Sequence, residues 1–181
     1  FLANIDPVLQ YSVLKQMKKP KLVACDSMNY WIETKKADFE KLMDKIDILL
    51  LNEAEARMFT GESNLMKAAR LIVAMGPKAV VIKKGEHGVI YFYRDSYFIT
   101  PAYLLESLYD PTGAGDTFAG GMMGYLSKAG KITESAIRNS IVYGSILASF
   151  AVEDFSVNKL LEISRDDIKA RFDHFKDITR F

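Results

Sequence analysis

The sequence has 181 residues, which is enough for one domain of ordinary size or for a large part of a bigger protein. Hydrophobic residues make up 49% and charged residues 26%, the balance of a soluble globular protein. The net charge of +1 lacks the basic excess of a nucleic-acid-binding protein, and no apolar run approaches the roughly 20 residues of a membrane span. We therefore expect neither nucleic acid nor a membrane as a partner.

Two features of the sequence bear on the cellular compartment of the protein and on whether the chain is part of a longer protein. The single cysteine, Cys25, excludes an internal disulfide framework and favours a reducing cytoplasm, and no signal peptide is visible. The chain opens with Phe1 instead of Met, in a segment typical of the end of a strand. We expect a cytoplasmic protein of which this chain is a C-terminal part.

The first half of the chain alternates short apolar runs with longer amphipathic segments. The apolar runs predict strands buried on both faces, as in a parallel sheet, at Lys21–Asp26, Ile46–Asn52 and Ala79–Gly85. Helices are predicted between and before them, at Pro7–Met17, Asp38–Met43, Glu53–Phe59 and Leu65–Met75. This alternation predicts an α/β fold with a mostly parallel sheet flanked by helices.

The second half changes in character. Gly88–Thr100 contains two β-rich runs split by Arg94–Ser96, which predicts an antiparallel hairpin. Helices are then predicted from about Asp116 to Leu126, over Thr133–Val152 and over Ser164–Thr179. Because no repeat, low-complexity segment or linker interrupts the chain, residues 1–181 are expected to form a single α/β domain.

A glycine-rich stretch stands just before the predicted helix at Asp116. A helix N-terminus presents unpaired N–H groups and the positive end of its dipole, so Gly113, Ala114 and Gly115 predict an anion hole for a phosphoryl group. A carboxylate at Asp116 could accept the proton of a hydroxyl that attacks phosphorus. The alternative is that Asp116 only caps the helix, because short motifs often match by chance.

The longer string DPTGAGDTFAGG resembles the C-terminal signature of the ribokinase-like, or phosphofructokinase-B-type, carbohydrate kinases, D-x-x-G-A-G-D-x-F-x-x-G. The matching residues are Asp110, Gly113, Ala114, Gly115, Asp116, Phe118 and Gly121. The resemblance implies a Rossmann-like ribokinase fold and transfer of the γ-phosphoryl group of ATP, with Mg²⁺, to a hydroxyl of a sugar or nucleoside. It also implies that Asp116 is the base, that Gly113–Asp116 form the anion hole, and that Asp110 and Thr112 help to bind a monovalent cation such as K⁺.

Asn52 and Glu55 follow the second predicted strand as an N-x-x-E motif. Asn with Glu three residues later is also the sequence of an N-terminal cap with its reciprocal partner. In the resembling kinases this motif organises Mg²⁺ and phosphate, so Glu55 would act on Mg²⁺, through water. Both roles can hold at once, and the position of the motif after a strand favours a functional one.

Two further segments are implied to contact the nucleotide. The turn VIKKGEHG resembles the segment that runs beside the nucleotide phosphates in these kinases, with Lys83, Lys84, Gly85 and Gly88 as candidates. The alternative is a simple hairpin turn with solvated lysines. Ser145 lies among small residues that would admit a flat base near the helix over Thr133–Val152, although close helix packing also requires small residues.

The chain lacks a counterpart of the N-terminal region that supplies most sugar contacts and the small β lid in the resembling kinases. The acceptor is therefore not identified, activity of the chain alone is not implied, and a homodimer would form through the absent lid. A second hypothesis is a non-catalytic, regulatory nucleotide-binding homologue. A dinucleotide-binding domain is disfavoured, because its G-x-G-x-x-G motif belongs between the first strand and helix.

Overall fold

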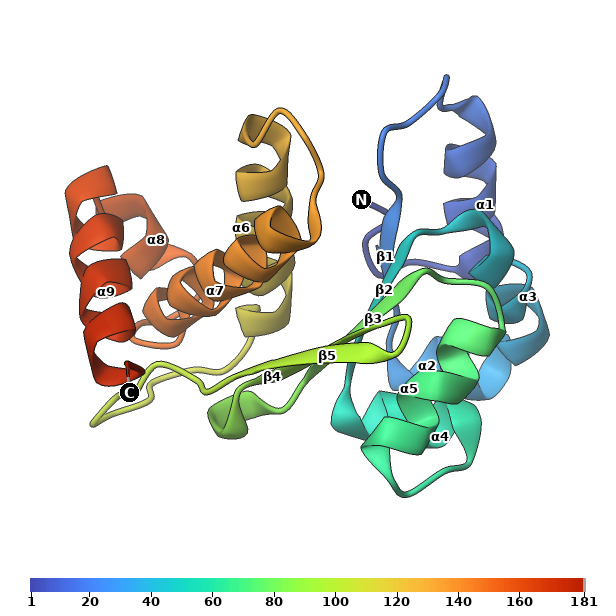
Figure 1. Cartoon of the computed structure of the whole chain (residues 1–181), viewed down its shortest axis with the longest axis horizontal. Coiled ribbons are helices and arrows are strands. Elements are labelled where there is room, and N and C mark those ends of the chain that lie inside the picture. The colour runs from blue at the N-terminus through green and yellow to red at the C-terminus, as the bar shows by residue number, and fades with distance from the viewer. Residues whose placement is uncertain (181) are drawn as a thin grey trace. The chain divides into compact units, whose positions relative to one another are not determined.

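The computed structural model describes residues 1–180, which divide into two compact units. Unit 1 comprises Phe1–Gly85 and Val89–Ile99, and unit 2 comprises Glu86–Gly88 and the chain from Thr100 onward. The single domain expected from the sequence stays a prediction. Figure 1 labels the elements of both units.

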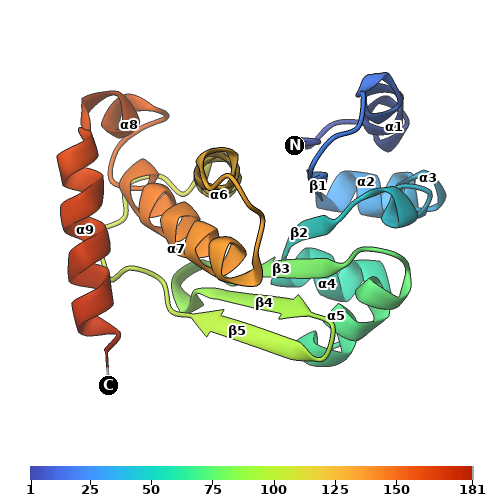
Figure 2. The same cartoon turned by 45° about the horizontal axis from the view of Figure 1, so that its top comes forward.

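A five-stranded sheet is the centre of unit 1, and its strands lie side by side in chain order, β1-β2-β3-β4-β5. β1 (Ala24–Asp26), β2 (Ile48–Asn52) and β3 (Ala79–Lys83) are parallel, with Leu49 beside Cys25 on one side and beside Val80 on the other. β4 (Val89–Tyr93) is antiparallel to β3, and β5 (Ser96–Thr100) runs opposite to β4 in Figure 2. The predicted α/β fold and hairpin are confirmed.

Helices flank the parallel strands, as the sequence pattern predicts. They are α1 (Pro7–Gln16), α2 (Asn29–Thr34), α3 (Lys36–Glu40), α4 (Glu53–Thr60) and α5 (Leu65–Ala74), although α2 has no counterpart among the predicted helices. The helix predicted at Asp38–Met43 is different in the structure, where α3 ends at Glu40 and a separate 3-10 turn covers Met43–Lys45. Both short pieces still bury their apolar residues, Phe39 and Met43, so the apolar pattern reflects burial and not one continuous helix.

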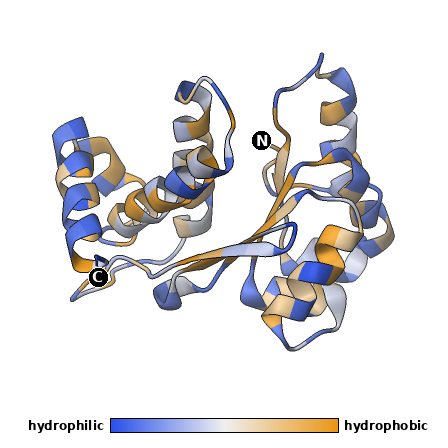
Figure 3. Cartoon of the chain, in the orientation of Figure 1, coloured by the Kyte–Doolittle hydropathy of each residue, from blue (hydrophilic) through white to orange (hydrophobic). Residues whose placement is uncertain are grey.

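One face of the sheet packs on the helices. Alternate strand residues, including Leu49, Leu51, Val80 and Ile82, form a hydrophobic cluster with residues of α2 to α5 such as Ile32, Phe39, Phe59 and Ile72. The parallel strands are mostly hydrophobic in Figure 3, whereas part of the β4-β5 hairpin is pale. On the other face, Leu50 and Val81 are also fully buried, which explains why the strands lack a polar alternation until Asn52 and Lys83 at their carboxyl ends.

Unit 2 is helical, with α6 (Ala114–Lys128), α7 (Glu134–Ala151), α8 (Asn158–Glu162) and α9 (Arg165–Ile178). α6 and α7 pack closely, because Gly121 and Gly144 face each other without side chains between them. α9 begins with a capping box between Ser164 and Asp167 and is largely hydrophilic in Figure 3, except where Phe175 packs on Ile146 and Phe150. In residues 1–180, no helix is long and apolar enough to cross a membrane.

Candidate active site

The glycine stretch forms the N-terminus of α6. The helix begins at Ala114, two residues before the predicted start, because Gly113 adopts a left-handed conformation (φ 79°) and turns the chain directly into the helix. Gly115 and Asp116 therefore lie within the first turn. The Ala114 N–H donates to the Pro111 carbonyl (3.2 Å), whereas no acceptor among residues 1–180 contacts the N–H groups of Gly115 and Asp116.

The start of α6 differs from that of every other described helix of eight or more residues. The N-cap side chains of α1, α4, α5, α7 and α9 each accept a backbone N–H bond, and these are Asp6, Asn52, Asn64, Thr133 and Ser164. The N-cap of α6 is Gly113, which has no side chain to do so. The N–H groups and positive dipole end of this helix are thus left available to an anion, and the exposed Asp116 stands beside them.

A tight turn leads into this helix. The Asp110 carboxylate accepts the Thr112 N–H (2.9 Å), and this hydrogen bond holds the pKa of Asp110 below its ordinary value. The segment is anchored at its start, because the Val152 carbonyl accepts the N–H groups of Tyr109 (2.8 Å) and Asp110 (3.4 Å). Val152 could not be identified from the sequence, because it contacts the loop through its backbone carbonyl, and such a contact does not require a particular residue type.

The small residues of α7 serve close helix packing. A Cβ at Gly144 would lie 2.6 Å from the Phe118 carbonyl oxygen of α6, so no side chain fits there. Ser145 is buried, and its Oγ has no hydrogen-bond partner among the described residues. The buried serines on either side differ, because Ser140 and Ser149 donate to carbonyls one turn back, at Ile137 and Ile146. Ser145 thus differs from both in having a buried hydroxyl without a hydrogen-bond partner among the described residues.

In unit 1, Asn52 and Glu55 form a complete capping box at the start of α4. The Asn52 Oδ1 accepts the Glu55 N–H and the Glu55 carboxylate accepts the Asn52 N–H, both at 2.8 Å. The capping role considered from the sequence is therefore confirmed. Burial raises the pKa of Glu55, while the Asn52 N–H and the positive charge of Lys83 oppose this rise.

The carboxyl ends of β2 and β3 bring Asn52 and Lys83 together, because they are directly paired in the parallel register. The two side chains lie on the same face of the sheet, opposite the cluster packed on α2 to α5. Lys84 follows Lys83, and both are half-buried. The structure thus groups three of the predicted residues, Asn52, Glu55 and Lys83, at one edge of the unit 1 sheet.

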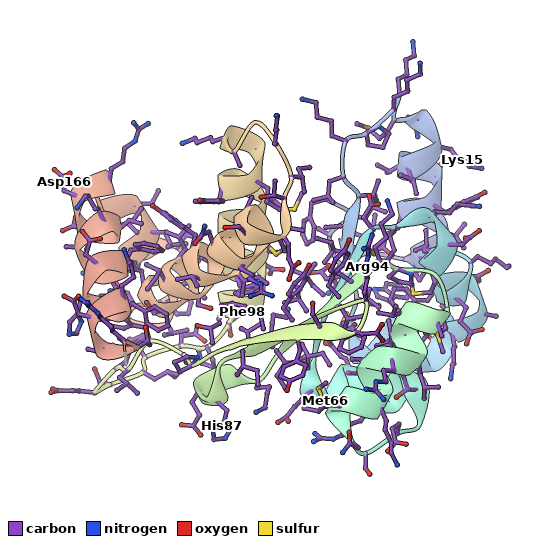
Figure 4. All side chains as sticks on the ribbon, viewed as in Figure 1. Lys15, Met66, His87, Arg94, Phe98 and Asp166 are labelled. Carbon is purple, nitrogen blue, oxygen red and sulfur yellow. The ribbon has the colours of Figure 1, made fainter. Side chains whose placement is uncertain are left out.

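The turn after β3 needs both of its glycines. Gly85 (φ 55°) and Gly88 (φ 84°) are in the left-handed region, and a Cβ at Gly88 would lie 2.1 Å from the Thr100 carbonyl oxygen. Gly85 has open space around its Cα, which leaves its backbone accessible. His87, between them, is exposed and points outward in Figure 4, and its contact with the Glu86 carboxylate (3.9 Å) is an exposed surface pair that does not mark it as catalytic.

The predicted residues fall into two groups. Unit 1 holds Asn52, Glu55, Lys83, Lys84 and Gly85; unit 2 holds Gly88, Asp110, Thr112, Gly113, Ala114, Gly115, Asp116 and Ser145. In residues 1–180, no group of three or more His, Cys, Asp or Glu side chains is placed to hold a metal ion.

The family to which the chain belongs is shown by its similarity to known proteins. Residues 9–163 match the pfkB family of carbohydrate kinases. The chain belongs to this family. Among curated pfkB-type relatives, the cytidine kinase of Thermococcus kodakarensis is 34% identical over 141 residues, which are 76% of this chain and 50% of that protein.

Solved structures show the same fold. Fructokinase from Vibrio cholerae O395, bound to fructose, ADP and calcium, has a TM-score of 0.79 and 20% identity, over 90% of this chain and 54% of its own. Aminoimidazole riboside kinase from Salmonella enterica, bound to aminoimidazole riboside and an ATP analog, has a TM-score of 0.74 and 20% identity, over 83% and 52%. The chain thus spans about half the length of these relatives of the pfkB family.

Proposed function

We propose that the protein carrying this chain transfers the γ-phosphoryl group of ATP to a hydroxyl of a sugar or nucleoside. The observation that supports this proposal best is the start of α6, where a left-handed Gly113 leaves the first N–H groups without a capping side chain. A phosphoryl group fits such a terminus, because small residues allow an anion to approach the N–H groups closely.

Asp116 is the proposed general base. Its carboxylate is exposed and lies in the first helical turn, beside the N–H groups that would hold the transferring group. A hydroxyl within about 3 Å of the carboxylate can pass its proton to Asp116 as it attacks phosphorus. The same N–H groups stabilise charge on the phosphoryl oxygens during transfer, because they are fixed in place before the reaction starts.

The groups of unit 1 are assigned to the nucleotide and to Mg²⁺. One Glu55 oxygen accepts the Asn52 N–H, which leaves the other oxygen able to accept a hydrogen bond from a water of Mg²⁺. When bound, Mg²⁺ supplies positive charge that neutralises phosphate oxygens. Lys83 and Lys84 can add point charges beside the phosphates, and the open backbone at Gly85 allows close approach.

Four residues of unit 2 have two further proposed roles. The unpartnered hydroxyl of Ser145 is proposed to bind the nucleotide, together with the backbone at Gly88. Asp110 and Thr112 are proposed to help bind a monovalent cation such as K⁺, because carboxylate, hydroxyl and carbonyl oxygens are suitable ligands for hard cations. The Asp110 carboxylate accepts the Thr112 N–H and also interacts with the Thr112 side chain, so the carboxylate and hydroxyl oxygens of these two residues lie together.

The decisive test is Asp116→Asn in the full-length protein. We expect ATP binding to persist and turnover to fall by ~100-fold or more, since the amide cannot accept the hydroxyl proton. Asp166→Asn makes the same chemical change in the first turn of α9, where the side chain is exposed in Figure 4, and should leave turnover unchanged. Turnover would be followed with a panel of sugars and nucleosides.

Two outcomes would contradict the proposal in different ways. Near-normal turnover of the Asp116→Asn variant would remove the assigned role of this carboxylate. ATP binding by the unmodified protein without phosphoryl transfer to any acceptor of the panel would instead favour a non-catalytic nucleotide-binding homologue.

A further inference from the structure

The side chain of Arg171, on α9, is held from four directions within unit 2. Its guanidinium forms an ion pair with Glu153 (2.7 Å) and donates to the Ser149 Oγ (3.0 Å). Its central carbon lies 3.4 Å from the centre of the Phe150 ring and 4.9 Å from that of Tyr103. The Arg171 and Glu153 side chains are only 15% and 22% exposed, which separates this pair from the exposed Lys169–Asp173 pair of the same helix.

Glu153 lies at the point where α7 ends. Its N–H donates to the Phe150 carbonyl (3.1 Å), and it directly follows Val152, the C-cap of α7. The Val152 carbonyl in turn accepts the N–H groups of Tyr109 and Asp110. Arg171 therefore holds the segment just after α7, which is hydrogen-bonded to the loop before α6.

From Asp110 the connection continues to the start of α6. The Asp110 carboxylate accepts the Thr112 N–H, and Gly113 follows as the left-handed N-cap. A continuous series of contacts thus joins the guanidinium to the helix terminus, from Arg171 through Glu153 and Val152 to Asp110 and the turn.

We propose that Arg171 is a positioning residue for phosphoryl transfer, which acts by holding the end of α7 and, through it, the loop of residues 109–113 in front of α6. This inference rests on the proposed function, because it assumes that the start of α6 binds the transferring group. Removing the guanidinium leaves the half-buried Glu153 carboxylate without its partner, so this carboxylate moves toward water and the Val152 carbonyl moves with it. A small displacement of the loop misaligns the reacting groups, which lowers turnover strongly.

The test compares Arg171→Met with two matched variants in the full-length protein. Lys169→Met removes an exposed cation of the same helix, whose ion pair with Asp173 is on the surface. Phe175→Leu shortens a buried side chain of α9 that packs on Ile146 and Phe150, and it loosens the helix without changing the ion pair. The measurements are turnover at saturating ATP and acceptor, the melting temperature, and amide hydrogen exchange of residues 109–116.

We expect Arg171→Met to lower turnover by roughly 10- to 100-fold and to speed exchange in residues 109–116. Lys169→Met should change neither quantity, and Phe175→Leu should lower the melting temperature without the loss in turnover. Arg171→Lys should recover part of the turnover, because it keeps the charge but not the planar set of donors. Glu153→Gln should reproduce the defect, and the double variant should be no worse than the more impaired single one, because both act through one contact.

The inference is overturned if Phe175→Leu lowers turnover as much as Arg171→Met when the two variants have the same melting temperature. The loss of turnover would then follow from lower overall stability. It is also overturned if exchange of residues 109–116 does not respond to Arg171→Met. The hydrogen-exchange measurement does not depend on catalysis, so it tests this inference even if the proposed function is wrong. A failure of the proposed function would show itself separately, as an unmodified protein without activity.

Discussion

The close contact between α6 and α7 predicts how much the same Gly→Ala change alters the free energy of unfolding at two helical glycines. In Gly144→Ala, the new Cβ would lie 2.6 Å from the Phe118 carbonyl oxygen and 3.1 Å and 3.2 Å from two carbons of its ring. In Gly124→Ala, nothing lies within 4 Å of the new Cβ. Both changes gain about 0.5–1 kcal/mol of helix propensity, and this gain cancels in the comparison.

What is left is the cost of overpacking at Gly144. Forcing a methyl group against backbone costs about 1–3 kcal/mol, because Phe118 and its helix must move as a whole. A central value of about 2 kcal/mol corresponds to a melting temperature ~4–8 °C lower for Gly144→Ala than for Gly124→Ala. Gly124→Ala itself should be slightly more stable than the unmodified chain.

The two variants are compared by chemical and thermal denaturation, with Gly121→Ala as an intermediate case. There the new Cβ meets the end of the Leu147 side chain at 2.8 Å, and this flexible group can move aside. The expected order of stability is therefore Gly124→Ala, then Gly121→Ala, then Gly144→Ala. Equal stability of Gly124→Ala and Gly144→Ala would refute the close packing that we assign to the two helices.

Two further predictions concern carboxylates with shifted pKa values. Burial raises the pKa of Glu55, so the contribution of this carboxyl group to stability falls as the pH rises through that pKa. The Glu55→Gln side chain can still accept the Asn52 N–H, so this variant should be at least as stable as the unmodified protein at neutral pH. Its turnover should fall at low Mg²⁺ concentration. The Thr112 N–H lowers the pKa of Asp110, so that contribution is present above the ordinary Asp pKa and is lost as the pH falls through the lowered value. Asp110→Asn should therefore flatten the acid side of the stability profile in denaturation titrations, and an unchanged acid side would contradict the turn.

The sequence was sufficient to predict most elements of the sheet, because the strands are continuous apolar runs. β2 and β3 fall within the predicted runs, and β1 covers only the last part of Lys21–Asp26. The helices α1, α4 and α5 agree to within about a residue at each end, since Asp6, Asn52 and Asn64 mark their starts as capping residues. The break after α3 was not predictable, because buried apolar residues at helical spacing do not distinguish one helix from two short pieces.

The candidate site was predictable where it depends on residue type and not where it depends on tertiary contact. The glycines and Asp116 are local signals, although the start of α6 at Ala114 depends on the backbone of Gly113. The contact of Val152 with the loop and the clamp of Arg171 on Glu153 join segments far apart in the chain. No short-range pattern reports such contacts.

The order of the strands in unit 1 has a consequence for how the chain folds. Because the sheet order is the chain order, each new strand has its neighbour already synthesised, and none must insert between two paired strands. Leu2 also forms a parallel bridge with Cys25 of β1. Only the turns that join β3 to β4 and β4 to β5 are short, so this antiparallel part costs little closure entropy and is expected to form before β1 and β2, whose connections contain helices, pair with it.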